Sequence, residues 1–257
     1  MNTVLLEKHD NYAIISLNRP EHMNALSREL RQDFVQAFDE CTRDEEVRVV
    51  ILSGNGKAFC AGFDLKELAS SSQDASEEAD NTIARAMEAF QGPIIGAVNG
   101  HAVTGGFEMA LACDILIASE NARFADTHAR VGILPGWGLS QKLPRLIGLS
   151  RAKEISFTGT PVFAQQALDW GLVNHVVAAE ELLPRAIKMA EDMCKCVPQI
   201  LLQYKPLIDD GYAMPYKEAL VWEEEQAIVS AKQAASAMIA GRREAVLAQG
   251  RSEKGES

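Results

Sequence analysis

One stretch, Asn99–Asp114, constrains this chain more than any other. An apolar, β-branched run at Ile94–Val98 leads into it and predicts a buried strand. Apolar residues at helical spacing follow over Phe107–Cys113, and the pair Gly105-Gly106 separates the two runs, with Thr104 before it as the predicted helix N-cap. Strand, loop and helix in this order leave bare backbone N–H groups at the helix start, where an anion is stabilised.

Glu108 lies one turn into this predicted helix. A carboxylate beside amides that bind an oxyanion is suited to proton transfer next to a carbonyl group. The alternative is a capping-box glutamate, which would have to occupy the third helical position. If Thr104 is the cap, Phe107 occupies that position and Glu108 follows one residue late.

The rest of the chain predicts a repeated order of strand, strand and helix, followed by an almost wholly helical C-terminal part. Ser27 and Ser150 are expected to cap helices, and Pro198, Pro206 and Pro215 to interrupt the helical part. A surface loop is expected at 70–81. Strands are predicted at 3–8, 12–17, 47–52, 94–98, 115–118, 122–126 and 174–177, and helices at 27–42, 64 onward, 83–90, 107–113, 139 onward, 151–158, 163–170 and 215–249.

Two further patterns agree with the central stretch. Lys57–Lys66 reads Lys-Ala-Phe-Cys-Ala-Gly-Phe-Asp-Leu-Lys, and Leu17–Pro20 with Met23–Leu26 forms an N-terminal loop motif. Together the three patterns resemble the crotonase superfamily, also called the enoyl-CoA hydratase/isomerase family. The resemblance implies an α/β fold, a right-handed spiral of ββα turns, with the spiral at 1–195 and a helical trimerisation region at 196–257.

The family's shared reaction step is stabilisation of a thioester enolate between two backbone N–H groups. The motifs place these groups at Phe63 and Gly105, and each is expected at a glycine-flanked helix start. The alternative is a tight turn in which the glycines are needed only for steric reasons and bind no ligand. Glu108 matches the first catalytic glutamate of the hydratases, which positions or deprotonates the water that attacks Cβ.

The second hydratase glutamate is absent, because the family pattern places His128 at that position. Histidine carries a proton near neutral pH, so His128 could replace the missing acid. If the preceding strand continues, Asp126 would share a face with His128 and orient its ring. The alternative is that His128 only lines the acyl pocket. Gly136 stands where isomerases and some lyases have aspartate, which argues against that isomerase subclass.

The resemblance also implies a coenzyme A site. The segments concerned are the backbone around Ala25 and the loop from Ala61 to Leu65, and Lys66 is expected near the phosphates, although it could equally be a solvated lysine. Trp137 and Phe63 would shape the acyl pocket or simply pack. The residues expected to contact CoA or substrate are Ala25, Ala61, Gly62, Asp64, Leu65, Lys66 and Trp137, and Lys66, Arg28 and Lys57 are candidate cations.

Charge and motif content limit the kinds of molecule that the protein is expected to bind. The formal net charge of −11 disfavours nucleic acid, and it means that local cations must attract any polyanionic CoA thioester. The sequence contains no membrane span, secretory signal or peroxisomal C-terminal address, so we expect a cytoplasmic protein without a membrane partner. No metal-ligand spacing or dinucleotide motif is present, so we expect no metal and no cofactor apart from the CoA carried by the substrate.

Three functions remain open from the sequence. The first is a lyase of fatty acid metabolism that hydrates a trans-2-enoyl-CoA to a 3-hydroxyacyl-CoA. The second is isomerisation or decarboxylation of an acyl-CoA on the same scaffold, and the third is acyl-CoA binding without turnover. The family resemblance further implies a homotrimer or a dimer of trimers.

Overall fold

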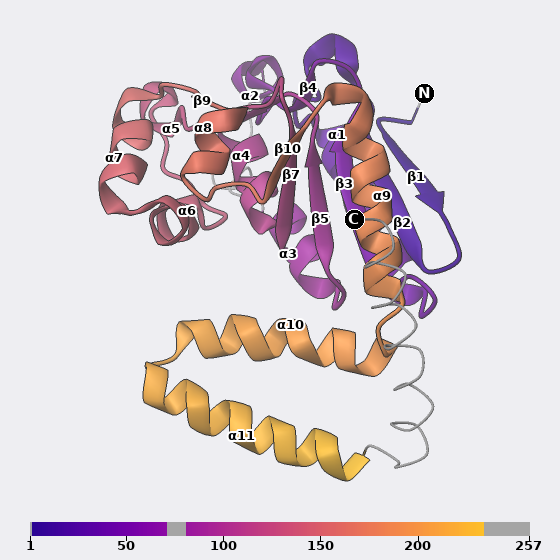
Figure 1. The fold of residues 1–257 in the computed structure, drawn as a ribbon. Helices are drawn as coiled ribbons and strands as arrows, with labels where there is room; N and C mark the ends of the chain where they lie inside the picture. Colours follow the sequence, from indigo (N-terminus) through magenta and orange to yellow (C-terminus); the bar gives the residue numbers. More distant parts are fainter. Residues whose placement is uncertain (1, 71–80, 234–257) are drawn as a thin grey trace. The chain divides into compact units, whose positions relative to one another are not determined.

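The computed structural model describes residues 2–70 and 81–233. These residues belong to two compact units, 1–202 and 203–257. The first unit contains two sheets and their surrounding helices (Figure 1). The trimerisation role predicted for residues 196–257 stays a prediction, and so does the boundary predicted after residue 195.

The larger sheet has the strand order β1-β2-β3-β5-β7-β10, and the smaller has the order β4-β6-β8-β9. All neighbours are parallel except the pairs β1–β2 and β8–β9. The strands are β1 Val4–Lys8, β2 Tyr12–Leu17, β3 Val49–Gly54, β4 Ala58–Cys60, β5 Ile94–Val98, β6 His101–Val103, β7 Ile115–Ser119, β8 Arg123–Ala125, β9 Val162–Phe163 and β10 His175–Val177.

The helices match most of the predicted runs. They are α1 Arg28–Arg43, α2 Leu65–Ser70, α3 Thr82–Ala89, α4 Gly105–Ala112, α5 His128–Val131, α6 Leu139–Ile147, α7 Leu149–Thr158, α8 Ala164–Asp169, α9 Leu182–Cys194, α10 Pro198–Ala213 and α11 Tyr216–Gln233, with short 3-10 turns at Pro20–His22 and Ala179–Glu181. Most of the loop predicted at 70–81 lies outside the described residues, as does the end of the helix predicted at 215–249.

The larger sheet is buried on both faces, which explains its continuous apolar strands. Side chains alternate between the two faces along β3: Val50 and Leu52 pack toward α1, whereas Val49 and Ile51 pack toward α9. Figure 1 shows α9 lying along one face of this sheet. The helices on the two faces therefore hold the strands of the larger sheet in place.

The chain passes three times from the large sheet to the small sheet and into a helix. The repeats are β3–β4–α2, β5–β6–α4 and β7–β8–α5, and the three strands of each sheet are neighbours. This is the predicted spiral of ββα turns. Because β4, β6 and β8 are parallel, their carboxyl ends and the three helix starts that follow lie along one edge.

One capping prediction and one proline prediction are wrong. Ser27 accepts a hydrogen bond from the Leu30 amide (3.2 Å) and caps α1 as expected, but Ser150 lies inside the first turn of α7. Gly148, with φ +87°, ends α6 and precedes α7 directly. Pro206 lies within α10, so the helix continues through it.

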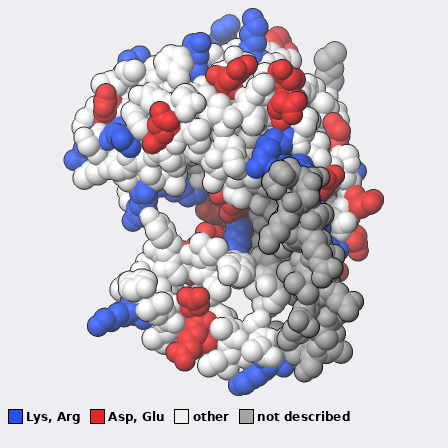
Figure 2. All heavy atoms as spheres, in the orientation of Figure 1, with Lys and Arg blue, Asp and Glu red and all other residues white. Residues whose placement is uncertain are grey.

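In the second unit, α10 and α11 are joined by a short turn at Met214-Pro215. The position of a Cβ on Gly211 lies 3.9 Å from Cβ of Ala219, so the two helices approach closely where α10 has no side chain. Several apolar side chains of α11 are exposed: Leu220, Val221, Ile228 and Val229. On the face shown in Figure 2, positive and negative side chains are interspersed.

Candidate active site

The candidate site lies at the carboxyl ends of β4, β6 and β8. Phe63 follows β4, Gly105 follows β6 and His128 follows β8. The parallel pairing of these strands places at one edge of the small sheet residues that are far apart in the sequence. The chemistry predicted for Phe63, Gly105 and His128 can therefore act on one ligand.

Gly62 joins the first two of these segments. Its φ of +85° is unfavourable for other residues, and a Cβ at this position would lie 2.9 Å from the Val103 carbonyl oxygen and 3.4 Å from the Gly105 amide nitrogen. The Phe63 turn and the Gly105 turn therefore touch. Among the described residues, neither the Phe63 amide nor the Gly105 amide donates a hydrogen bond to the protein. Phe63 is paired with Leu26 as a β-bridge two residues before α2, so its predicted place at a helix start is wrong.

Thr104 occupies the N-cap position of α4 but does not cap the helix with its side chain. Its hydroxyl is hydrogen-bonded to the Thr127 hydroxyl, and its amide donates to the Ala125 carbonyl (2.9 Å). Its φ of +54° is unusual for a β-branched residue. These contacts with the β8 segment hold the backbone in this conformation and leave the first amides of α4 uncapped.

Two aromatic rings flank the Gly105 backbone. The ring centroids of Phe63 and Trp137 are 5.5 Å apart, and a Cβ on Gly105 would lie 3.6 Å from an atom of each ring. The structure therefore brings the two predicted pocket-shaping residues together beside the candidate amides. Sequence reasoning missed Arg31, whose guanidinium lies 5.5 Å from the Phe63 ring centroid.

Glu108 is buried, with 3% of its surface exposed. Its Oε1 accepts hydrogen bonds from the backbone N–H of Trp137 (2.7 Å) and, more weakly, from that of Leu139 (3.5 Å). The Thr104 amide, which a capping box would require, donates to Ala125 instead. Glu108 is therefore not a capping-box residue, and the chain around Trp137 fixes its carboxylate.

His128 contacts two buried carboxylates. Its Nε2 lies 3.3 Å from Glu108 Oε2, and its Nδ1 lies 2.7 Å from Asp126 Oδ1. The strand predicted at 122–126 does not continue to His128, because β8 ends at Ala125 and α5 begins at His128. The pair instead forms across a turn, in which the His128 amide also donates to Asp126 Oδ1 (3.1 Å).

This arrangement favours a charged imidazole. Burial lowers the pKa of His128, but the hydrogen bonds and charges of Asp126 and Glu108 outweigh burial and raise the pKa to about 9. Burial likewise raises the pKa of Asp126, yet hydrogen bonds from His128 and Ser156 bring that pKa below its ordinary value. At neutral pH, His128 is therefore an imidazolium between two carboxyl groups.

Comparison with known proteins identifies the family of this chain. The model of the family described as enoyl-CoA hydratase/isomerase matches residues 7–243. The chain belongs to this family. It is 45% identical over 215 residues to "Probable enoyl-CoA hydratase 1, peroxisomal" of Arabidopsis thaliana, covering 84% of this chain and 81% of that protein.

Two further relatives of this enoyl-CoA hydratase/isomerase family member support the assignment. A protein named crotonyl-CoA hydratase from Syntrophomonas wolfei is 39% identical over 191 residues, covering 73% of this chain and 74% of that one. The crystal structure of enoyl-CoA hydratase from Bacillus anthracis superimposes with a TM-score of 0.86 at 35% identity, covering 97% and 96% of the two chains. The fold is therefore the crotonase fold.

The two motifs expected to contact CoA in this family member are joined by backbone hydrogen bonds. The Ala61 amide donates to the Met23 carbonyl (3.0 Å), and the Leu26 amide donates to the Gly62 carbonyl (2.8 Å). Ala25 thus lies beside the Ala61–Gly62 turn, and Leu65 and Lys66 are exposed at the start of α2. Lys57 precedes β4, at the opposite end of that strand from the site.

Asp64 has a structural partner that the motifs did not indicate. Its Oδ2 accepts from Arg19 (3.2 Å), and the same guanidinium donates to the Ala25 carbonyl (2.8 Å). Burial raises the pKa of Asp64, but the bond from Arg19 and two amides of α2 bring that pKa below its ordinary value. This ion pair joins the N-terminal loop to the loop that carries Phe63.

Asn24, in the N-terminal loop motif, has a structural role that the motif does not indicate. It is fully buried with φ +53°, and its Nδ2 donates to the carbonyls of Ala58 (2.7 Å) and Asn55 (3.0 Å). Its Oδ1 accepts from the Arg19 amide (2.8 Å). The sequence offered one clue to this role, which is that asparagine is common in tight turns.

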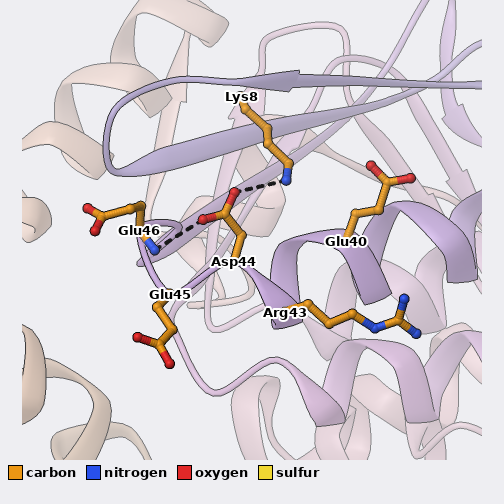
Figure 3. Close-up of a pocket in the computed structure, with 6 residues that line it drawn as sticks. All are labelled: Lys8, Glu40, Arg43, Asp44, Glu45 and Glu46. Atoms are coloured by element: carbon orange, nitrogen blue, oxygen red, sulfur yellow. Dashed lines mark hydrogen bonds and ion pairs between the residues drawn. The ribbon is translucent and has the colours of Figure 1, made fainter.

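An open hollow elsewhere contains none of the predicted site residues. It is lined by Lys8, Glu40, Arg43, Asp44, Glu45 and Glu46 (Figure 3). Lys8 forms a partly exposed ion pair with Asp44 (2.9 Å), so two of the charged residues that line the hollow neutralise each other. Within residues 2–70 and 81–233, no cluster of His, Cys, Asp and Glu could hold a metal ion, and no helix could cross a membrane.

Proposed function

We propose that this protein hydrates a trans-2-enoyl-CoA to the 3-hydroxyacyl-CoA. The observation that carries the proposal is the contact of 3.3 Å between Glu108 Oε2 and His128 Nε2, beside the uncommitted amides of Phe63 and Gly105. A carboxylate and an imidazolium in contact supply both a proton acceptor and a proton donor. The names of the relatives support the same reaction.

The amides of Phe63 and Gly105 act as the oxyanion hole. They donate hydrogen bonds to the thioester carbonyl oxygen, which gains negative charge as the enolate forms. One such donor typically contributes about 3 kcal/mol to the transition state. The Phe63 and Trp137 rings lie next to the same amides and would enclose the acyl group.

Glu108 takes a proton from water while the water oxygen bonds to Cβ. The electrons of the Cα–Cβ double bond then move toward the carbonyl oxygen. Cα takes a proton from His128 Nε2, which completes the addition of one water molecule. The proton held by Glu108 returns to His128 Nε2 across their contact of 3.3 Å, which restores the carboxylate and the imidazolium. The pair is then ready for another turnover.

The CoA moiety binds along Ala25, Ala61, Gly62, Asp64 and Leu65, with Lys66 near its phosphates. CoA enters with the substrate and no separate cofactor takes part. We further propose a homotrimer or a dimer of trimers, which the exposed apolar side chains of α11 support. A cytoplasmic location is our proposal for this chain.

The test is to mix the purified protein with crotonyl-CoA and follow the loss of the conjugated thioester absorbance. Mass spectrometry identifies the product, which should be heavier by one water molecule. Glu108→Gln should reduce kcat by about 1,000-fold. Glu120→Gln, which removes an exposed carboxylate, should retain wild-type kcat. An isomer of unchanged mass, or binding without turnover, would contradict the proposal.

A further inference from the structure

Asp126 is a buried carboxylate beside the catalytic pair. Only 2% of its surface is exposed. Its Oδ1 accepts from both the backbone amide and Nδ1 of His128, and the side chain of Ser156, on α7, also donates to the carboxyl group. A buried carboxylate with this many donors is fixed in orientation.

The contacts of Asp126 decide which nitrogen of His128 faces the reaction. With Nδ1 held at 2.7 Å by Asp126, only Nε2 remains to face Glu108. A hydrogen bond to one imidazole nitrogen sets the proton and the orientation of the other. The backbone bond from His128 to the same oxygen prevents Asp126 from rotating away.

We propose that Asp126 is a positioning residue for hydration, holding His128 protonated at Nδ1 and presenting Nε2–H toward Glu108, while Ser156 anchors Asp126 from α7. The inference rests on the hydratase function proposed above. Asp126 itself does not touch the substrate and acts only through His128. Its loss should lower kcat and leave KM almost unchanged.

The charged groups that act on the His128 ring are few. Within the described residues, Glu108 faces it from α4 and Asp126 faces it from the turn before α5. Ser156, the partner on α7, is neutral. The Arg130 guanidinium of α5 is directed to the Thr158 carbonyl. A change at Asp126 should therefore dominate any change in the titration of His128.

Asp126→Asn keeps the size of the side chain and removes its charge. We expect kcat to fall about 10- to 100-fold with KM within about twofold. The alkaline limb of the kcat–pH profile, where His128 loses its proton, should move down by at least about one pH unit. Asp33→Asn is a matched control, because Asp33 accepts from the Thr3 amide (3.0 Å) and hydroxyl (2.7 Å) but holds no histidine. That control should keep the wild-type profile.

Two further measurements guard against misfolding. Ser156→Ala removes one support of Asp126 and should move the same limb in the same direction by a smaller amount. The NMR titration of the His128 ring in the full protein reports the same change without turnover. The inference is overturned if the His128 ring titrates in Asp126→Asn as it does in the wild type. It is also overturned if the variant keeps both the wild-type kcat and the wild-type alkaline limb.

His128→Gln separates this inference from the proposed function. If His128→Gln retains wild-type kcat, the proposed role of the pair is wrong. If His128→Gln loses activity while Asp126→Asn keeps the wild-type limb, the hydratase proposal stands and only the positioning role fails.

Discussion

Replacement of His128 by glutamine should flatten the dependence of stability on pH. The folded protein raises the pKa of His128 from 6.5 to about 9, so the folded state binds this proton more tightly than the unfolded chain does. At about 1.4 kcal/mol per pKa unit, the difference corresponds to about 3 kcal/mol of stability. This contribution is fully present below about pH 6.5 and is lost as the pH rises through about 9.

The assay is urea unfolding of wild type and His128→Gln at several pH values from 6 to 9.5, at one fixed protein concentration because assembly also affects stability. The other histidines are present in both proteins, so their titration largely cancels. Wild-type stability should fall by about 3 kcal/mol more than that of the variant across this range. Parallel curves would refute the assignment of His128 as a buried imidazolium.

Three substitutions test the packing around the candidate site. Gly106→Ala should cost at least about 3 kcal/mol of stability by urea unfolding, because its Cβ would lie 2.0 Å from the Cys60 carbonyl oxygen. Gly105→Ala, whose Cβ meets only ordinary contacts, should cost less than about 1 kcal/mol but reduce kcat/KM for crotonyl-CoA about 100-fold, since the methyl group enters the space beside the amides. A large loss of stability with intact kcat/KM would contradict this. Asn24→Ala should cost about 2–3 kcal/mol, because it removes the Asn24 hydrogen bonds to the Ala58 and Asn55 carbonyls and places alanine at positive φ; a thermal midpoint equal to that of wild type would contradict this.

The repeated ββα order was predictable because it depends on local signals. Apolar runs marked β3, β5 and β7, and Ser27 marked the start of α1. The glycine pair Gly105-Gly106 then indicated where α4 begins. The motifs also carried the family resemblance, and that resemblance brought Phe63, Gly105 and Glu108 into one predicted site.

The parts that sequence reasoning missed depend on contacts between distant segments. Thr104 adopts positive φ only because Ala125 and Thr127 bind its amide and hydroxyl. The chain turns after β8 and α5 begins at His128, since the Asp126 side chain binds the His128 amide. Neither contact follows from local propensity.

The contact between Glu108 and His128 has the same origin. Each residue was predicted from its own motif, but nothing in either motif gives their separation. It follows from the parallel pairing of β6 and β8, which places the starts of α4 and α5 side by side. The role of His128 was therefore an open alternative at the level of sequence.

The most direct test of the central claim, that Glu108 and His128 work as one proton-transferring pair, is a double-mutant cycle of hydration rates. The rate of crotonyl-CoA hydration is measured for wild type, Glu108→Gln, His128→Gln and the double variant. Each single variant should lose at least about 100-fold in kcat. The kcat of the double variant should lie within about threefold of the kcat of the slower single variant. Losses that multiply in the double variant would mean that the two residues act independently, and would contradict the account.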